Sequence, residues 1–112
     1  MGFSANQARL MSLISRRSDL ELEAQFISQQ RLYMGNMVSG YFNLHAKLEP
    51  GSQAARLLDA KIKQLQQADK MLEMHLNRIN SQREAINKEQ ESVQKLISDN
   101  IQRSFGLMGG GR

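Results

Sequence analysis

The stretch "KLEPGSQAAR", residues 47–56, holds the only proline of a 112-residue chain, and a glycine follows it directly. Long segments without proline lie on both sides of it. The ring of Pro50 disfavours a helical conformation at Glu49, and Gly51 tolerates a positive φ. Ser52 then stands where a helix N-cap is favoured. This stretch therefore predicts a tight turn between two helices.

Apolar residues recur every seven positions on each side of this turn, which is the spacing of a coiled coil. An apolar series fills the d positions of the heptads in both halves, and a mixed apolar and polar series fills the a positions. The d series are Leu13, Leu20, Ile27, Met34, Tyr41 and Leu48, then Leu58, Leu65, Leu72, Ile79, Ile86 and Val93; the a series are Leu10, Arg17, Ala24, Arg31, Val38 and His45, then Ile62, Asp69, Leu76, Arg83, Gln90 and Ile97.

Two equal arms joined by a short turn must run antiparallel, so the predicted fold class is all-α, a long antiparallel two-helix coiled-coil hairpin. We expect one hairpin over residues 1–105, with arm one at about 4–48, the turn at 49–52 and arm two at about 53–105. Gly106 is expected to stop the second helix, and residues 106–112, rich in glycine, to form a flexible tail.

Folding about the turn places each a residue of one arm near a d residue of the other. Val38 then faces Leu65, and Arg31 faces Leu72. In this register each polar a residue lies against an apolar partner, so no layer of the seam is wholly polar.

Arm one carries many large apolar residues outside this seam, and a helix that is apolar nearly all round is a buried helix. Burying one large apolar side chain stabilises a protein by about 1.5–3 kcal/mol. A single hairpin leaves these side chains exposed to water, so we expect it to be one part of a larger assembly. We expect the hairpin to assemble further, with an assembly interface formed by Met11, Ile14, Leu22, Phe26, Leu32, Tyr33, Met37, Phe42 and Leu44.

Gly35 and Gly40 lie inside arm one, where each is about 1 kcal/mol less favourable than alanine. Two interpretations remain open. The glycines bend or fray the helix locally, or the missing Cβ atoms let a neighbouring helix approach closely in an assembly.

The charge is mild and evenly spread, which argues against a nucleic-acid partner. Residues 1–48 carry five Lys or Arg against three Asp or Glu, and residues 49–112 carry ten against eight. The chain has no cysteine, no apolar run of the roughly 18–20 residues that span a membrane, and no secretory signal pattern. We therefore expect no membrane span, and either a cytoplasmic location or export by a route that needs no signal peptide.

The sequence offers no motif for catalysis. Neither His45 nor His75 has a second histidine three or four positions away, and the terminal glycines follow a helix, so no helix N-terminus is available there to hold a phosphate. We expect no enzyme activity, no metal and no cofactor. The seven methionines are typical of adaptable packing at a protein interface.

Three segments carry a resemblance to a known class of protein: "NQARLMSLISRRSDLELEAQFISQQR" (6–31), "EPGSQ" (49–53) and "INSQREAINKEQESVQKLISDNIQRSF" (79–105). Together with the hairpin pattern, they make the chain similar to the small axial and needle subunits of bacterial flagellar and type III secretion systems. The resemblance implies a helical subunit that assembles into a filament or tube.

Three functional hypotheses follow. The first is a self-assembling structural subunit of a filament, tube or secretion-related assembly, with arm one inside and arm two outside. The second is an accessory hairpin that docks on a larger export or membrane-associated machine, similar to the export-apparatus stalk proteins. The third is a basic coiled-coil binder of nucleic acid, which would need a steep salt dependence of binding.

Overall fold

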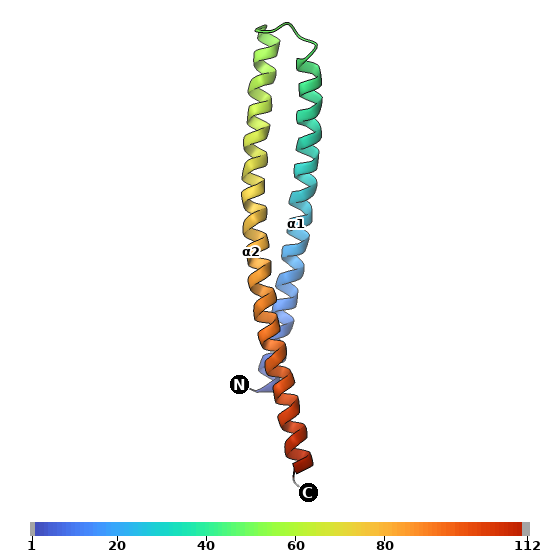
Figure 1. Cartoon of the computed structure of the whole chain (residues 1–112), viewed down its shortest axis with the longest axis vertical. Helices are drawn as coiled ribbons and strands as arrows, with labels where there is room; N and C mark the ends of the chain where they lie inside the picture. The colour runs from blue at the N-terminus through green and yellow to red at the C-terminus, as the bar shows by residue number, and fades with distance from the viewer. Residues whose placement is uncertain (1, 111–112) are drawn as a thin grey trace. The chain divides into compact units, whose positions relative to one another are not determined.

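The computed structural model describes residues 2–110, with side chains described for residues 2–106. Over these residues the chain forms two α-helices, α1 (Phe3–His45) and α2 (Gln53–Gly110), joined by a short connection (Figure 1). The predicted all-α helical hairpin is confirmed. Within the described residues, neither helix has a stretch long and apolar enough to cross a membrane.

The helices form two compact units, which we describe separately. The turn unit is Glu23–Ile79 and includes the connection between the helices. The terminal unit combines α1 up to Leu22 with α2 from Asn80 onward.

The helices run antiparallel in both units, as the ion pairs between them show. In the turn unit His45 pairs with Asp59, and Arg31, earlier in α1, pairs with the later Asp69. In the terminal unit the same inverse order holds for Glu21 with Arg83 and for Arg9 with Glu89.

The core of the turn unit is the predicted seam. Its buried apolar residues all lie at a or d positions of the heptads, where each helix faces the other. They are Ala24, Ile27, Ala55, Ile62 and Ile79. Ala55 extends the a series one heptad toward the turn, because it lies seven positions before Ile62.

The core of the terminal unit follows the same heptads. Leu13, Ile86 and Val93 are buried together, and Leu10, Leu20 and Ile97 pack against them. These six residues come from both helices and occupy only a and d positions. The seven-residue series thus identifies the buried side of both helices in this unit.

The first helix ends earlier than the sequence predicts, at His45 rather than at residue 48. Two backbone hydrogen bonds that join residues three positions apart, instead of four, follow the end of the helix. They run from the Lys47 N–H to the Leu44 carbonyl and from the Leu48 N–H to the His45 carbonyl, each 3.1 Å. The backbone leaves the helical conformation before Pro50, because the proline ring disfavours that conformation at Glu49. The connection is therefore residues 46–52.

The predicted turn lies at the end of this connection. The Ser52 N–H donates to the Glu49 carbonyl at 3.1 Å, and Gly51 has a φ of 78°. Pro50 followed by a glycine of positive φ is the pattern of a type II β-turn. Pro50 and Gly51 thus have the conformational roles that the sequence predicts for them.

Ser52 caps α2, because the Ala55 N–H donates to its side-chain Oγ at 3.1 Å. We expect Ser52→Ala to lower the free energy of unfolding by about 1 kcal/mol, since a free N–H is left at the helix start. Urea denaturation below the concentration of any assembly measures this. A matched Ser52→Gly variant should lose only a few tenths of a kcal/mol. Equal stability of Ser52→Ala and the unmodified chain would contradict the cap.

The second helix continues beyond the predicted stop. Gly106 was expected to end it, but α2 runs through this residue to Gly110. A glycine ends a helix when it takes a left-handed conformation, and otherwise costs only about 1 kcal/mol relative to alanine. Residues 111 and 112 of the predicted tail lie outside the described residues.

Candidate assembly surface

The nine residues predicted to form an assembly interface lie outside the seam in the single chain. Met37 is half-buried, and the other eight are exposed. Met11, Ile14 and Leu22 belong to the terminal unit, and the remaining six belong to the turn unit. None of the nine belongs to the buried core of the hairpin. That a second molecule covers them stays a prediction.

In the turn unit these residues fall on two sides of α1. Leu32 and Phe42 occupy the b and e positions, next to the a side of the seam, and we call this side the a-side flank. Four others occupy the c and g positions, next to the d side, and we call them the d-side flank. The d-side flank is Phe26, Tyr33, Met37 and Leu44.

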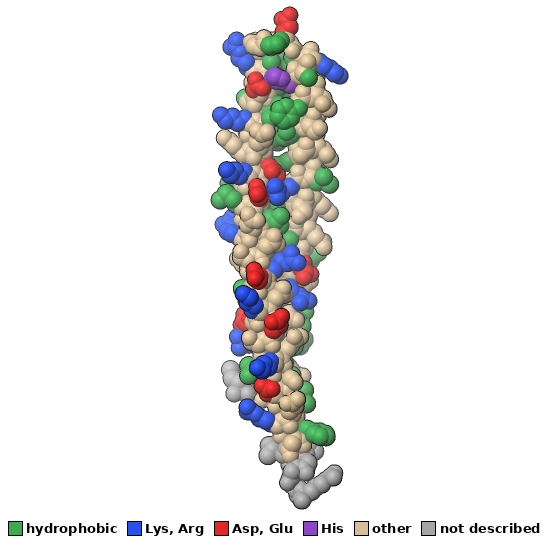
Figure 2. Space-filling model, viewed as in Figure 1, with side chains coloured by type: hydrophobic (Ala, Val, Ile, Leu, Met, Phe, Trp, Pro, Cys, Tyr) green, Lys and Arg blue, Asp and Glu red, His purple; other side chains and the backbone are tan. Residues whose placement is uncertain are grey.

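The same part of α1 has almost no charge. From Ala24 to Leu44 the only charged residue is Arg31, and its side chain is paired with Asp69 of α2. The gaps between apolar residues are filled mainly by Gln, Asn, Ser and Gly. In the upper part of Figure 2, blue and red side chains gather over α2, while the α1 side is mostly tan and green. The exposed surface of α1 here is uncharged and partly apolar.

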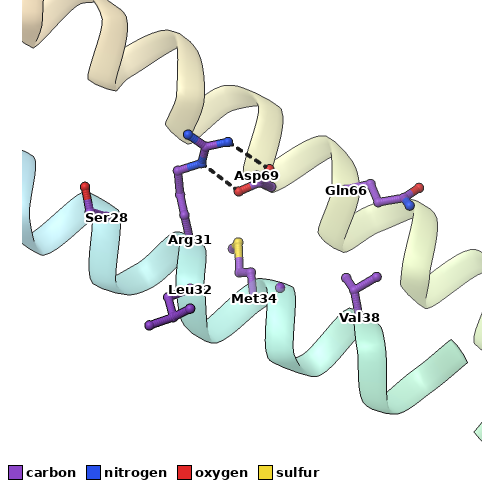
Figure 3. Close-up of a pocket in the computed structure, with 8 residues that line it drawn as sticks. Ser28, Arg31, Leu32, Met34, Val38, Gln66 and Asp69 are labelled. Carbon is purple, nitrogen blue, oxygen red and sulfur yellow. Dashed lines mark hydrogen bonds and ion pairs between the residues drawn. The ribbon is translucent and has the colours of Figure 1, made fainter. Parts of the chain in front are cut away.

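An open groove of about 500 Å³ lies between the helices of the turn unit (Figure 3). From α1, Arg31, Met34 and Val38 extend toward α2 across it, while Gly35 contributes no side chain. The groove is on the a-side flank, since it reaches Leu32. Its lining residues are Ser28, Arg31, Leu32, Met34, Gly35, Val38, Gln66 and Asp69.

An ion-pair cluster lines this groove. The Arg31 Nε lies 2.9 Å from Asp69 Oδ1, and a second guanidinium nitrogen lies 3.4 Å from Asp69 Oδ2 and 3.8 Å from Glu73. The hydrogen bond to Asp69 is the largest cause that raises the pKa of Arg31; desolvation by burial opposes it, and the negative charges of Asp69 and Glu73 raise the pKa further. The charges of Arg31 and Asp69 are thus paired with each other inside the hairpin.

The sequence prediction missed this pairing, since it placed Arg31 against Leu72. The guanidinium instead turns toward Asp69, one helical turn nearer the connection, so two polar a residues do meet. The signal was present in the sequence. Arg31 and Asp69 are opposite charges at a positions, and they lie at nearly equal distances along the chain from the turn.

The two histidines make contacts between the helices of the turn unit. His75 Nε2 lies 3.1 Å from a carboxylate oxygen of Glu23. His45 Nε2 lies 2.9 Å from Asp59 Oδ1, but without the alignment of a hydrogen bond. Among the described residues, no three His, Cys, Asp or Glu side chains lie together as metal ligands would.

Gly35 and Gly40 do not interrupt α1, which continues through both. A Cβ atom built on either glycine meets nothing within 4 Å in the single chain. No contact inside the hairpin therefore requires a glycine at these positions, and the space beside each of them is open.

We expect Gly35→Ala to raise the free energy of unfolding of the unassembled hairpin by about 1 kcal/mol, because alanine favours a helix and its Cβ has room. Chemical denaturation of dilute protein, followed by circular dichroism, measures the change. A loss of stability would show that the backbone at Gly35 departs from an ordinary helix.

The terminal unit has a second exposed apolar cluster. Phe3 at the start of α1 and Ile101 and Phe105 of α2 line a shallow hollow of about 380 Å³ with Asn100 and Ser104. All three apolar side chains are exposed. The sequence shows Phe3 as an apolar residue of the first half and Ile101 and Phe105 as apolar residues of the second half, but the interface prediction included none of the three.

Comparison with family models, with curated proteins and with solved structures finds no match for this chain. The similarity to flagellar and type III secretion subunits remains a hypothesis based on the three quoted segments. The function proposed below rests on the surface of the hairpin.

Proposed function

We propose that this protein is a structural subunit that assembles with copies of itself, in a filament, tube or related assembly, by burying the outer surface of α1. One observation carries the proposal. Five large apolar side chains of the turn unit are exposed on α1, namely Phe26, Leu32, Tyr33, Phe42 and Leu44. The only charged residue in this stretch, Arg31, is already paired with Asp69 of α2.

The size of this surface favours a stable contact. Three of the five side chains are aromatic, and an aromatic side chain buries about 150–250 Å². With the two leucines, and at half to two-thirds exposure, the five side chains present on the order of 500 Å² of apolar surface. This area is divided between the a-side flank and the d-side flank, so it is not one contiguous patch; the two flanks together expose as much apolar surface as the largest patch of a monomer, about 300–600 Å². The amide and hydroxyl groups between the apolar side chains add to the area that a contact on either flank can bury.

The charge distribution favours a second copy over a charged partner. A surface without charge gains nothing from an acidic or basic partner, and two such surfaces meet without repulsion between like charges. Nucleic acid is disfavoured as a partner for the same reason, because the basic residues of the turn unit lie mainly on α2 and alternate with acids. Interaction between uncharged surfaces also predicts an assembly that persists as salt is raised.

The proposal is tested by the mass of the purified protein over a wide range of concentration, using sedimentation velocity and negative-stain electron microscopy. We expect particles that grow with concentration and persist at high salt. A chain that stays monomeric throughout would contradict self-assembly. Capture of a different protein by that monomer would favour the accessory hairpin, and salt-sensitive binding of DNA or RNA would favour the nucleic-acid binder.

A further inference from the structure

We infer that copies of this chain pack through two different surfaces, with Tyr33 on the d-side flank of one copy inserted into the groove beside Gly35 of the next. This inference rests on the proposed self-assembly and specifies its interface. It also states the symmetry class, since a contact between two unlike surfaces adds copies one after another, into an open filament or, where the rotation between copies closes, into a ring.

The first argument is the position of the two surfaces on α1. The groove opens on the a-side flank, while Tyr33 lies at a c position on the d-side flank. A two-fold contact buries the same patch of both partners, so a d-side flank paired with itself would leave the groove and Leu32 exposed. A contact between unlike flanks covers both surfaces in every copy except those at the ends.

The second argument is the fit of the side chain to the groove. Tyr33 is 67% exposed, so its ring is free to enter a neighbouring molecule. A cavity of about 150 Å³ accommodates benzene, and the groove, at about 500 Å³, is larger. Its walls include Leu32, Met34 and Val38, which suit the ring.

The polar groups of the groove suit the hydroxyl of the same residue. A buried tyrosine hydroxyl needs a hydrogen-bond partner, and Ser28 and Gln66 supply donors and acceptors at the edges of the groove. A neutral phenol also leaves the pairing of Arg31 with Asp69 intact, because it brings no charge that competes for either partner.

The third argument is the glycine itself. Gly35 lines the groove, and any longer side chain there would project into the space that a neighbouring ring occupies. Inside one chain nothing approaches the position of its missing Cβ within 4 Å. A residue unfavourable in a helix and not needed for packing within the hairpin is explained by the entry of a side chain from a second copy.

The test uses two full-length variants that each block one surface. Tyr33→Glu leaves the groove intact and removes the ring that enters the groove of the next copy. Gly35→Gln fills the groove and leaves Tyr33 intact. Each variant alone should need at least a tenfold higher concentration than the unmodified chain to form large particles. Mixed in equal amounts, they should form a complex of two chains that grows no further, because only one productive contact remains.

Two conservative variants serve as controls. Gly35→Ala should assemble less readily than the unmodified chain and more readily than Gly35→Gln, because a single methyl takes only part of the space that the ring occupies. Tyr33→Phe should assemble more weakly than the unmodified chain and more strongly than Tyr33→Glu, since only the hydroxyl is lost. Circular dichroism and light scattering report the helix content and mass of every variant.

The outcomes separate this inference from the proposed function. If the unmodified chain assembles and Gly35→Gln assembles equally well, the groove is not an interface and the inference is wrong, while self-assembly stands. If the mixture of variants stays monomeric, the two surfaces do not meet each other, and the inference is again wrong. A monomeric unmodified chain would contradict both.

Discussion

Phe26→Glu is expected to abolish assembly while leaving the hairpin helical. The side chain is 61% exposed in the single chain, so a carboxylate there stays in water and disturbs little. At an interface the same carboxylate loses its water without gaining a partner, which costs several kcal/mol. A cost of about 3 kcal/mol lowers the association constant by roughly a hundredfold. Sedimentation velocity and circular dichroism measure the two effects together.

Phe42→Glu extends the test to the a-side flank, and the same loss of assembly is expected there. The matched control is Lys63→Glu, an exposed charge reversal on α2 within the same unit. A change at a solvated surface position alters stability by about 0.5 kcal/mol or less, so this variant should assemble normally. If both phenylalanine variants assemble like Lys63→Glu, α1 is not the buried surface.

Ile79→Ala is expected to destabilise the hairpin by about 2–5 kcal/mol, the range for removing most of a buried aliphatic side chain. Ile79 is 2% exposed at a d position of the seam, so the lost methyl groups leave a cavity. Helix content against urea concentration, measured on dilute protein, gives the change. Met71→Ala, at an exposed position of the same helix, should cost about 0.5 kcal/mol or less. Equal effects would contradict the seam.

The sequence allows the hairpin and its seam to be predicted well, because a two-helix fold has only two strong signals. One is the seven-residue period, which identifies buried residues as distant from the turn as Val93. The other is Pro50 with Gly51, whose backbone preferences define the turn itself. Both signals depend on residues close in the chain.

The helix ends were predicted less well, because they depend on small differences in backbone free energy. Gly106 looks like a stop, yet α2 passes through it. At the connection, His45 is the last residue of α1 although the heptads continue to Leu48. A hydrophobic pattern does not show where the chain must begin to bend.

The candidate surface was predicted as a set of residues but not as a shape. Each exposed apolar residue could be identified from its position outside the seam. The groove beside Gly35 could not, since it depends on which way Arg31 turns and on the space left between two helices. The pairing of Arg31 with Asp69 is a contact between residues 38 positions apart, which spacing along one helix does not show.

The central claim is that copies of this chain bury the outer surface of α1 when they assemble. The most direct measurement is the rate at which a thiol reagent labels a single introduced cysteine, because the chain has no cysteine of its own. At position 30, where the exposed Gln30 lies between Phe26 and Tyr33 on the d-side flank, we expect fast labelling in dilute protein and at least tenfold slower labelling in the assembled state. At position 63 on α2 the rate should stay the same. Equal rates at position 30 in dilute and assembled protein would contradict the claim.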